Sequence, residues 1–349
     1  MRELESEVRS LVEAQLGVAV TKIEPIAAGI GLRRFFRVET DGSPRTLVAR
    51  VEAAEDPAGR PPGIPPEPPV EPLRRFLERA GLPVPRRYGG DAAQGIELHE
   101  DLGADSLADL APTLAGAERA AVYRAVLAWI PALQRLRDPG GLPTFARRLD
   151  RAHFRYKGDL FATWSLPLAL GRAATDAEAD AIRAAFEGLA DRLADAPLRL
   201  AHRDLQSRNV QVRPSAPGAA PRLAMIDFQG AFLAPPEYDA VALLRDSYVE
   251  LPDAEVAAQL AWLRRQLPDA PDPDTFQRRF DLLTIARKGK DHARFVYAWR
   301  QRGDARYLDH LPATARALRA AGARLAASDA ALAPLAGALA RLPDAPCAP

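Results

Sequence analysis

The sequence predicts an α+β fold with a small β-rich N-terminal lobe over residues 1–100 and a large helical C-terminal lobe over residues 101–349. Three observations lead to this prediction. Short apolar runs alternate with tight turns in residues 22–51, which is typical of a small antiparallel sheet. A proline-rich segment then interrupts regular structure. From about residue 105 onward, most apolar side chains recur at helical spacing.

The N-terminal lobe is expected to begin with an amphipathic helix over residues 3–17. Its apolar residues lie three or four positions apart, and Gly17 marks its end. Strands are expected over residues 22–27, 34–39, 46–51 and 95–99. Gly29 and Gly31 lie in the turn between the first two strands.

Residues 57–72 contain eight prolines. Proline fixes φ and lacks a backbone N–H, so this segment cannot be an interior helix or strand. We expect a surface loop of polyproline character there. A short helix over residues 73–80, ending at Gly81, is expected to follow.

Helical patterns dominate the C-terminal lobe and cover roughly residues 105–137, 176–195, 236–266, 274–300 and 311–341. Residues 198–232 are the exception, because short apolar runs around a polar turn predict a strand–turn–strand unit. The chemistry-bearing motifs fall in this exception.

Composition excludes several classes of protein. The chain has 47 Lys and Arg residues against 46 Asp and Glu, a net charge of +1, whereas general nucleic-acid binders carry a basic surplus. Cys347 is the one cysteine, so an intrachain disulfide is excluded. The acidic start argues against a signal peptide, and no apolar run is long enough to cross a membrane. We therefore expect a cytoplasmic monomer that binds neither nucleic acid nor membranes.

The most informative segment, residues 202–209, has the pattern H-R-D-L-x-x-x-N, and D-F-Q follows from Asp227. This spacing is typical of phosphoryl-transfer enzymes. Transfer to a hydroxyl needs a carboxylate that orients the hydroxyl and accepts its proton, and Asp204 holds that position. It also needs oxygen ligands for Mg²⁺, for which Asn209 and Asp227 are the candidates. A chance match is the disfavoured alternative, because the whole H-R-D-L-x-x-x-N pattern and the later D-F-Q are both present.

His202 allows two interpretations. Histidine titrates near neutrality, so this residue could act as a base. In loops of this kind, however, the histidine packs behind the loop and maintains its shape. We favour the structural role.

A glycine-bearing hairpin in the N-terminal lobe could cover nucleotide phosphates. Gly29 and Gly31 occupy it, with Arg33 and Arg34 directly after them; a tight turn that needs positive φ is the alternative. On the third expected strand, Arg50 lies nearest to the position where kinases use a lysine for the α/β-phosphates. Arginine is a planar fork and lysine a point charge, so the two are not equivalent.

The segment that leads into the C-terminal lobe, residues 99–102, could offer main-chain groups to adenine. Its residues are His99, Glu100, Asp101 and Leu102. A linker without a ligand is the equally weighted alternative.

The acceptor is expected to be a small molecule. The segment Pro235-Pro236-Glu237 could be mistaken for the A-P-E element of protein kinases, but it begins only eight residues after Asp227. Docking of a peptide needs a longer activation segment between these two points. A hydroxyl of a small molecule is therefore favoured.

The chain resembles the aminoglycoside-phosphotransferase-like (choline-kinase-like) kinases, and among them the anomeric kinases that phosphorylate N-acetylmuramate and N-acetylglucosamine at C1. The matching segments are 32–38, 99–103, 202–209, 227–229, 238–246, 302–308 and 311–312. The resemblance implies a bilobal protein-kinase-like fold, ATP with Mg²⁺, Asp204 as the base, and Asn209 and Asp227 as metal ligands. The implied product is a sugar 1-phosphate that feeds nucleotide-sugar synthesis during peptidoglycan recycling.

The sequence departs from the pattern of these kinases beside the expected acceptor site. Gly230 follows D-F-Q where an acid is expected, and Leu205-Gln206 replaces an aromatic–histidine pair. The candidates for acceptor contacts are Gln206, Gln229, Arg245, Asp246 and Tyr248. An arginine among them could pair with a carboxylate such as the lactyl group of N-acetylmuramate. A structural ion pair between Arg245 and Asp246 is equally open.

The basic segment 287–294 also has two interpretations. We favour a solvated helix face, and the rim of an anionic-substrate site is the alternative. Two other functions stay open. An aminoglycoside-type antibiotic phosphotransferase would bind a polycation, which this basic segment disfavours. A catalytically degenerate nucleotide-binding protein is supported only by Arg50 in place of lysine.

Overall fold

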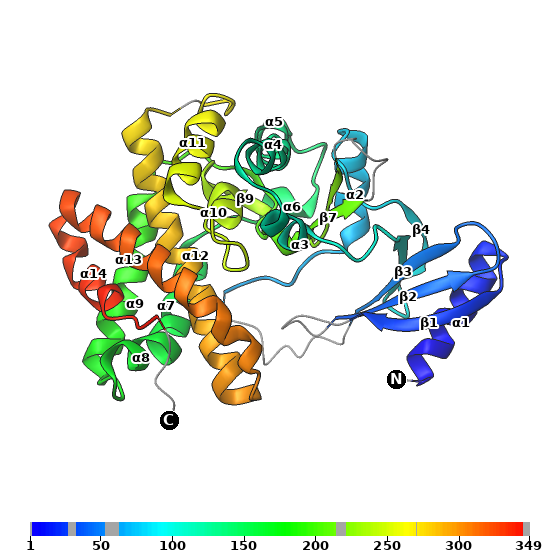
Figure 1. Cartoon of the computed structure of the whole chain (residues 1–349), viewed down its shortest axis with the longest axis horizontal. Coiled ribbons are helices and arrows are strands. Elements are labelled where there is room, and N and C mark those ends of the chain that lie inside the picture. The colour runs from blue at the N-terminus through cyan, green and yellow to red at the C-terminus, as the bar shows by residue number, and fades with distance from the viewer. Residues whose placement is uncertain (1, 27–32, 53–62, 214–220, 270, 345–349) are drawn as a thin grey trace. The chain divides into compact units, whose positions relative to one another are not determined.

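The computed structural model describes residues 2–26, 33–52, 63–213, 221–269 and 271–344. These residues belong to two compact units (Figure 1). The first contains Met1–Arg60, Pro83–Ala104 and Gln211–Ile226, and the second contains Pro61–Leu82, Asp105–Val210 and Asp227–Pro349. The predicted α+β class is confirmed, with an N-terminal antiparallel sheet and a mostly helical remainder.

The first unit is built on a five-stranded antiparallel sheet with the strand order β1-β2-β3-β5-β4. Its strands are β1 (Val20–Ile26), β2 (Arg34–Thr40), β3 (Thr46–Val51), β4 (Arg87–Asp91) and β5 (Ile96–Glu100). Helix α1 (Arg2–Leu16) contributes Val8 and Val12 to a core that it shares with Phe36, Val38 and Leu47 of the sheet. This shared apolar core holds the helix and the sheet together.

A two-stranded sheet of β7 (Val210–Arg213) and β8 (Arg222–Met225) accompanies the first unit. The Met225 N–H donates a hydrogen bond to the Pro83 carbonyl at 2.8 Å. Arg213 forms an ion pair with Glu100 at the end of β5. These contacts attach the chain that follows residues 202–209 to the first unit.

Helices make up most of the second unit. They are α2 (Val70–Arg79), α3 (Leu107–Leu110), α4 (Gly116–Leu127), α5 (Trp129–Arg135), α6 (Pro143–Ala146), α7 (Arg151–Leu160), α8 (Leu166–Leu170), α9 (Asp176–Arg192), α10 (Tyr238–Leu244), α11 (Asp253–Arg264), α12 (Pro273–Arg302), α13 (Leu311–Ser328) and α14 (Ala333–Ala340). Short helical turns are η2 (Ala111–Thr113), η3 (Phe161–Ser165, π-helical), η4 (Ser207–Asn209), η5 (Ala305–His310) and η6 (Ala330–Leu332). Strands β6 (Arg199–Ala201) and β9 (Phe232–Ala234) pair antiparallel.

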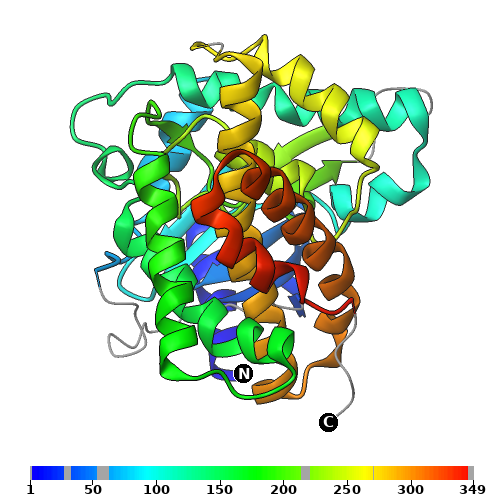
Figure 2. The ribbon, with the colours of Figure 1, turned by 90° about the vertical axis from the view of Figure 1, so that its left-hand side faces the viewer.

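Helix α12 is the central element of the second unit. The Asp272 carboxylate accepts hydrogen bonds from the N–H groups of Asp274 and Thr275 at its start, and Gly303, with φ 66°, ends it. Helices α7, α10 and α13 all pack against it, and Figure 2 shows α13 and α14 in front of it. Because α12 is covered from several sides, even charged residues in its middle are enclosed.

The structure differs from the prediction in several helices. Helix α2 begins at Val70, inside the expected loop, because Pro69 and Pro72 lie at the cap and in the first turn, where a missing N–H is tolerated. Helices α7 and α8 occupy a stretch where no helix was predicted. The expected helices 105–137, 236–266 and 311–341 are each divided into shorter ones.

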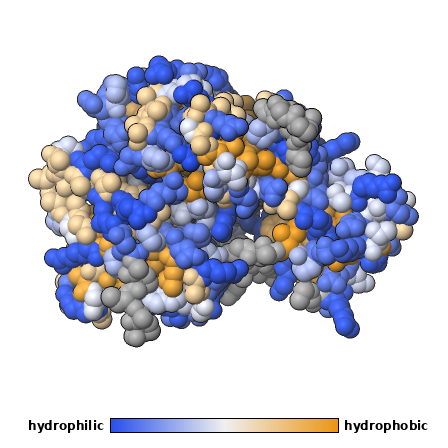
Figure 3. Space-filling model, in the orientation of Figure 1, coloured by the Kyte–Doolittle hydropathy of each residue, from blue (hydrophilic) through white to orange (hydrophobic). Residues whose placement is uncertain are grey.

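No helix within the described ranges is long and apolar enough to cross a membrane. Figure 3 shows hydrophilic residues over most of the visible face of each unit, interspersed with smaller hydrophobic patches. This mixed surface agrees with the nearly balanced numbers of acidic and basic residues.

Candidate active site

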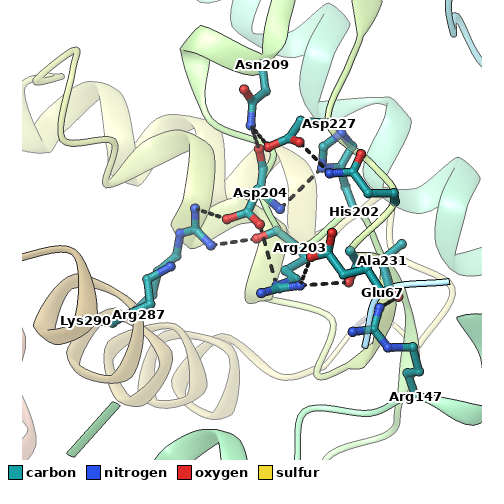
Figure 4. Close-up of polar contacts among 12 residues, drawn as sticks. Glu67, Arg147, His202, Arg203, Asp204, Asn209, Asp227, Ala231, Arg287 and Lys290 are labelled. Atoms are coloured by element: carbon teal, nitrogen blue, oxygen red, sulfur yellow. Dashed lines mark hydrogen bonds and ion pairs between the residues drawn. The ribbon is translucent and has the colours of Figure 1, made fainter. Parts of the chain in front are cut away.

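The loop of residues 202–209 follows β6 and ends in η4, within the second unit. The side-chain amide of Asn209 donates a hydrogen bond to the Asp204 carbonyl at 2.7 Å and to Asp227 Oδ2 at 3.4 Å (Figure 4). The structure therefore brings together the three residues that the sequence singled out as candidate base and metal ligands.

Two residues of the site have unusual backbone conformations. Arg203 and Asp227 adopt φ values of 81° and 64°, and no other non-glycine residue in the described ranges has a positive φ. Such conformations are unfavourable when a Cβ is present, so the surrounding structure must impose them. At Arg203, Asp239 in the first turn of α10 supplies such a constraint by accepting the N–H groups of His202 at 2.7 Å and Arg203 at 3.0 Å. Burial raises the pKa of Asp239 to about 6.

Asp246 supports the other end of the loop. Its Oδ2 accepts the Ser207 N–H at 2.7 Å and its Oδ1 accepts the Tyr248 N–H at 3.1 Å. Asp246 is a candidate for contact with the acceptor substrate, but both of its carboxylate oxygens thus accept hydrogen bonds from main-chain N–H groups. Arg245, its neighbour, forms an ion pair with Asp253 at 2.8 Å.

His202 is buried beneath the loop. Its Nδ1 accepts the N–H of Asp204 at 3.3 Å, and its ring lies edge-on to Phe228 with 6.4 Å between centroids. These contacts support the loop from its inner side.

The Asp204 carboxylate is flanked by two guanidinium groups. Arg287 Nη2 donates to Oδ1 at 3.2 Å, and Arg203 Nε lies 3.6 Å from Oδ2. Burial by itself would raise the pKa of Asp204, but the charges of Arg287, Lys290 and Arg203 outweigh it and hold this pKa well below its usual range. The carboxylate is therefore ionised at neutral pH. About a quarter of the side chain (26%) is exposed and can meet a ligand.

Arg287 is the principal partner of Asp204, and it comes from α12. It also donates to the Arg203 carbonyl at 2.6 Å and lies over the Tyr238 ring, with 5.8 Å from Cζ to the centroid. The favoured interpretation of residues 287–294 as a solvated helix face is wrong for Arg287, Lys288 and His292, which are buried. Their charges led us to expect exposure to solvent, but these side chains are buried because α12 lies at the centre of the second unit.

Arg203 is positioned by Glu67, a residue of the proline-rich segment. Arg203 Nη1 donates to Glu67 Oε1 at 2.8 Å. A Cβ at Gly230 would lie 2.5 Å from Arg203 Nη1 and 3.0 Å from Glu67 Oε1, closer than side-chain atoms normally approach. The glycine after D-F-Q thus leaves the space in which this ion pair forms.

Asn209 and Asp227 fit Mg²⁺ by the chemistry of their donors. Carboxamide and carboxylate oxygens are ligands that Mg²⁺ prefers. The Asp204 carbonyl holds Asn209 Nδ2, which fixes the orientation of the amide, and Gln229 Nε2 donates to Asp227 Oδ1 at 2.6 Å. Within the described residues, no three His, Cys, Asp or Glu side chains gather around one point. A metal here would therefore use few protein ligands together with phosphate oxygens and water, which is typical of Mg²⁺ sites.

The remaining candidate acceptor residues lie on or near this loop. Gln206 is half-buried, and its main chain bonds to Asp204 and Asn209 at 2.8 Å. Gln229 is buried with its amide on Asp227. The Arg208 guanidinium lies over the Tyr248 ring, 3.8 Å from the ring centroid. The His310 ring packs edge-on against the same tyrosine, with 4.7 Å between ring centroids.

The candidate nucleotide residues lie in the first unit. Gly29 and Gly31 fall outside the described residues. Arg33 Nε lies 3.0 Å from Glu52 Oε2, and Arg50, buried on β3, pairs with Glu52 Oε1. The Glu52 carboxylate thus forms ion pairs with two guanidinium groups. Arg34 is exposed on β2.

The residues at and after the end of β5 are engaged within the first unit. Arg37 Nε donates to Asp101 Oδ2 at 2.8 Å, and the Gly103 N–H donates to Asp101 Oδ1 at 3.0 Å. Glu100 accepts the Arg86 N–H at 3.1 Å, and Leu102 is buried. His99 pairs with Val48 of β3 across the sheet.

Glu237 is expected to make the stability of the protein depend on pH. It is completely buried, its nearest cation Arg279 lies 4.0 Å from Oε1, and burial raises its pKa to about 7. Folding therefore favours the protonated acid, so wild-type stability should fall as pH rises from about 4.5 to 7. We expect Glu237→Gln to add about 1–3 kcal/mol to the free energy of unfolding at pH 8 and little at pH 5.

Urea unfolding at both pH values measures this effect. Glu250→Gln is the control, because Glu250 lies in an exposed ion pair with Arg316 and should give no pH-dependent gain. An equal effect of Glu237→Gln at pH 5 and pH 8 would contradict the prediction.

Comparisons with known proteins establish the family of this chain. Residues 22–276 match the family model described as "Phosphotransferase enzyme family". The chain belongs to this family. The phosphotransferase is 28% identical over 316 residues to the N-acetylmuramate/N-acetylglucosamine kinase of Pseudomonas aeruginosa, covering 88% of this chain and 86% of that protein. It is 29% identical over 246 residues to the kinase of the same name from Pseudomonas putida, covering 69% of this chain and 68% of that protein.

Solved structures share the fold of this phosphotransferase. Choline kinase LicA from Streptococcus pneumoniae superposes with a TM-score of 0.59 at 16% identity, covering 91% of this chain and 99% of that chain. The streptomycin–ATP–APH(2")-IIa ternary complex gives a TM-score of 0.57 at 15% identity, covering 88% and 95%. At these identities the likeness establishes the fold.

Proposed function

We propose that this phosphotransferase moves a phosphoryl group from ATP to a sugar hydroxyl, namely the anomeric C1 hydroxyl of N-acetylmuramate, N-acetylglucosamine or a related sugar. The observation that carries the proposal is the ionised, partly exposed Asp204 carboxylate beside Asn209 and Asp227. The names of the relatives from two Pseudomonas species support the acceptor class. The product would be a sugar 1-phosphate, a substrate for nucleotide-sugar synthesis in peptidoglycan recycling.

In this proposal, Asp204 orients the acceptor hydroxyl and accepts its proton. Its carboxylate accepts a hydrogen bond from the acceptor hydroxyl and takes the proton as the new O–P bond forms, while the bond between the γ-phosphorus and the bridging oxygen of ATP breaks and ADP leaves. Because phosphoryl transfer passes through a loose transition state, an acid of low pKa is basic enough for this late transfer. Asn209 and Asp227 would hold Mg²⁺, which neutralises charge on the phosphate groups when bound.

The nucleotide contacts are assigned to the first unit. Arg50 and Arg33, gathered by Glu52, are proposed to bind ATP phosphates, together with Arg34 and the backbone at Gly29 and Gly31. Two guanidinium groups around one carboxylate leave positive charge for a phosphate. The backbone of residues 99–102 is proposed to contact adenine. In this scheme residues 1–100 cover the nucleotide, and residues 101–349 supply the catalytic loop and the acceptor site.

The charge around Asp204 favours a sugar over an aminoglycoside. Arg287 and Lys290 lower the pKa of Asp204 most strongly among its charged neighbours, so a polycationic acceptor would meet repulsion there. The degenerate alternative is disfavoured because the candidate base and both candidate metal ligands are in contact.

The test is ADP release from ATP with Mg²⁺ in the presence of N-acetylmuramate, N-acetylglucosamine, glucose, galactose or kanamycin. We expect turnover with an amino sugar, loss of turnover when EDTA removes Mg²⁺, and a ³¹P signal of an anomeric phosphate in the product. Turnover with kanamycin alone would support the antibiotic-modifying function. Binding of ATP without ADP formation from any acceptor would support the degenerate one.

A further inference from the structure

Helix α12 carries a concentration of positive charge beside the catalytic loop. Arg287, Lys288 and Lys290 lie within one turn of it, and Lys157 of α7 belongs to the same cluster, which we call the α12 cation cluster. Asp291 is shared between two of these residues: Lys288 Nζ lies 2.7 Å from its Oδ2 and Lys290 Nζ 3.2 Å from its Oδ1. The carboxylate thus neutralises two ammonium groups incompletely.

Lys157 lies beside these cations, and the described residues provide no hydrogen-bond partner for its Nζ. Its Nζ is buried and lies 5.3 Å from the ring centroids of both Phe154 and Tyr238. Burial, followed by the charges of Lys290, Arg287 and Arg203, lowers the pKa of Lys157 well below its usual value. An enclosed group of like charges is unfavourable, and an arriving anion would relieve it.

Lys290 is the member of the cluster that a ligand can reach. The side chains of Arg287 and Lys288 are only 1% and 2% exposed, and they already contact Asp204 and Ser247. Lys290 is 14% exposed and lies one turn after Arg287, on the same side of α12 (Figure 4). Arg287, one turn before Lys290, lies 3.2 Å from Asp204 Oδ1, where the acceptor hydroxyl would lie.

We propose that Lys290 binds an anionic group, carboxylate or phosphate, that the acceptor carries in addition to the hydroxyl that is phosphorylated. This inference rests on the proposed function and assigns Lys290 as the residue that selects acidic acceptors. Arg287 and Lys288 act behind it by maintaining the positive potential. A neutral sugar would leave the cluster uncompensated, so it would be the poorer substrate.

The experiment compares two sugars that differ in one acidic group. N-Acetylmuramate carries a lactyl carboxylate that N-acetylglucosamine lacks. We would measure kcat/KM for each sugar and KM for ATP. The proteins compared are the wild type, Lys290→Gln, Lys290→Arg and Arg300→Gln. Arg300 is the matched control, because it lies exposed in the last turn of the same helix.

We expect the wild type to prefer N-acetylmuramate by about tenfold or more. Lys290→Gln should lower kcat/KM for N-acetylmuramate by about 10- to 100-fold, the range for loss of a hydrogen bond between charged groups, and change the value for N-acetylglucosamine by less than about threefold. Lys290→Arg should retain most of the preference, and Arg300→Gln all of it. Equal losses for both sugars, a raised KM for ATP with no change in preference, or no preference in the wild type would overturn the inference.

A binding measurement separates this inference from the proposed function. If the wild type phosphorylates neither sugar, the proposed function fails, and calorimetric titration with inorganic phosphate still decides the role of Lys290. Tighter binding to the wild type than to Lys290→Gln, by about tenfold, supports an anion site. Equal binding to both proteins, or none to either, overturns it.

Discussion

Asp204→Asn is expected to reduce kcat by at least about 1000-fold while leaving the fold and ATP binding close to wild type. Asparagine keeps the shape of the side chain and an oxygen for the Arg287 hydrogen bond at 3.2 Å. It removes the negative charge that orients the acceptor hydroxyl and the site that takes its proton. ADP release, a thermal unfolding curve and ATP titration together measure the three properties.

Asp180→Asn is the control for loss of a carboxylate. Asp180 lies at the surface in an ion pair with Arg183 at 2.7 Å, and its loss should leave kcat unchanged. An Asp204→Asn variant that keeps more than about a tenth of wild-type kcat would show that another group takes the proton.

Arg287→Met is expected to have the second-largest effect, on both stability and turnover. Methionine removes the donors to the Asp204 carboxylate and to the Arg203 carbonyl, and it leaves a carboxylate with one guanidinium neighbour instead of two. Breaking a buried ion pair at one end costs about 3–5 kcal/mol. Since the Asp204 side chain is partly exposed, we expect about 3 kcal/mol in urea unfolding, with kcat reduced about 100-fold.

Arg287→Lys separates position from charge. Lysine retains the charge but cannot donate to both acceptors in the planar geometry of a guanidinium, so it should recover stability more than kcat. Arg183→Met, at a surface pair, should cost less than about 1 kcal/mol and leave turnover unchanged. A wild-type kcat in Arg287→Met would mean that Asp204 keeps its position without this contact.

Local patterns allowed most of the sheet and the close approach of Asp204, Asn209 and Asp227 to be predicted. Strand β2 alternates buried and outward residues, and the loop motif places Asp204 and Asn209 within a few residues of each other, so neighbours in sequence determine both. Strand β4 was not predicted, because Gly89 and Gly90 weaken its strand pattern and its pairing with β5 supplies the order. Residues of the 202–209 motif could be placed together because the motif itself determines the local backbone geometry.

Residues that act across the fold could not be predicted. Arg287 lies 83 positions from Asp204 in sequence, and its charge suggested a solvated face. Lys157 is on a helix that was not expected at all. Asp150, whose carboxylate accepts the His153 N–H at 3.1 Å, was a capping signal that could have located that helix. Burial of such charges depends on α12 lying at the centre of the second unit, which no local pattern encodes.

The ion pair between Glu67 and Arg203 has an evolutionary consequence. Residues 67 and 230 are far apart in sequence, yet they share the space around one guanidinium group, since a side chain at 230 would displace it from Glu67. An acid at 230 could itself pair with Arg203 in place of Glu67, whereas glycine at 230 leaves space for Glu67 to form the pair. The two positions are therefore expected to covary among homologues, so that the proline-rich segment diverges in step with the residue after D-F-Q.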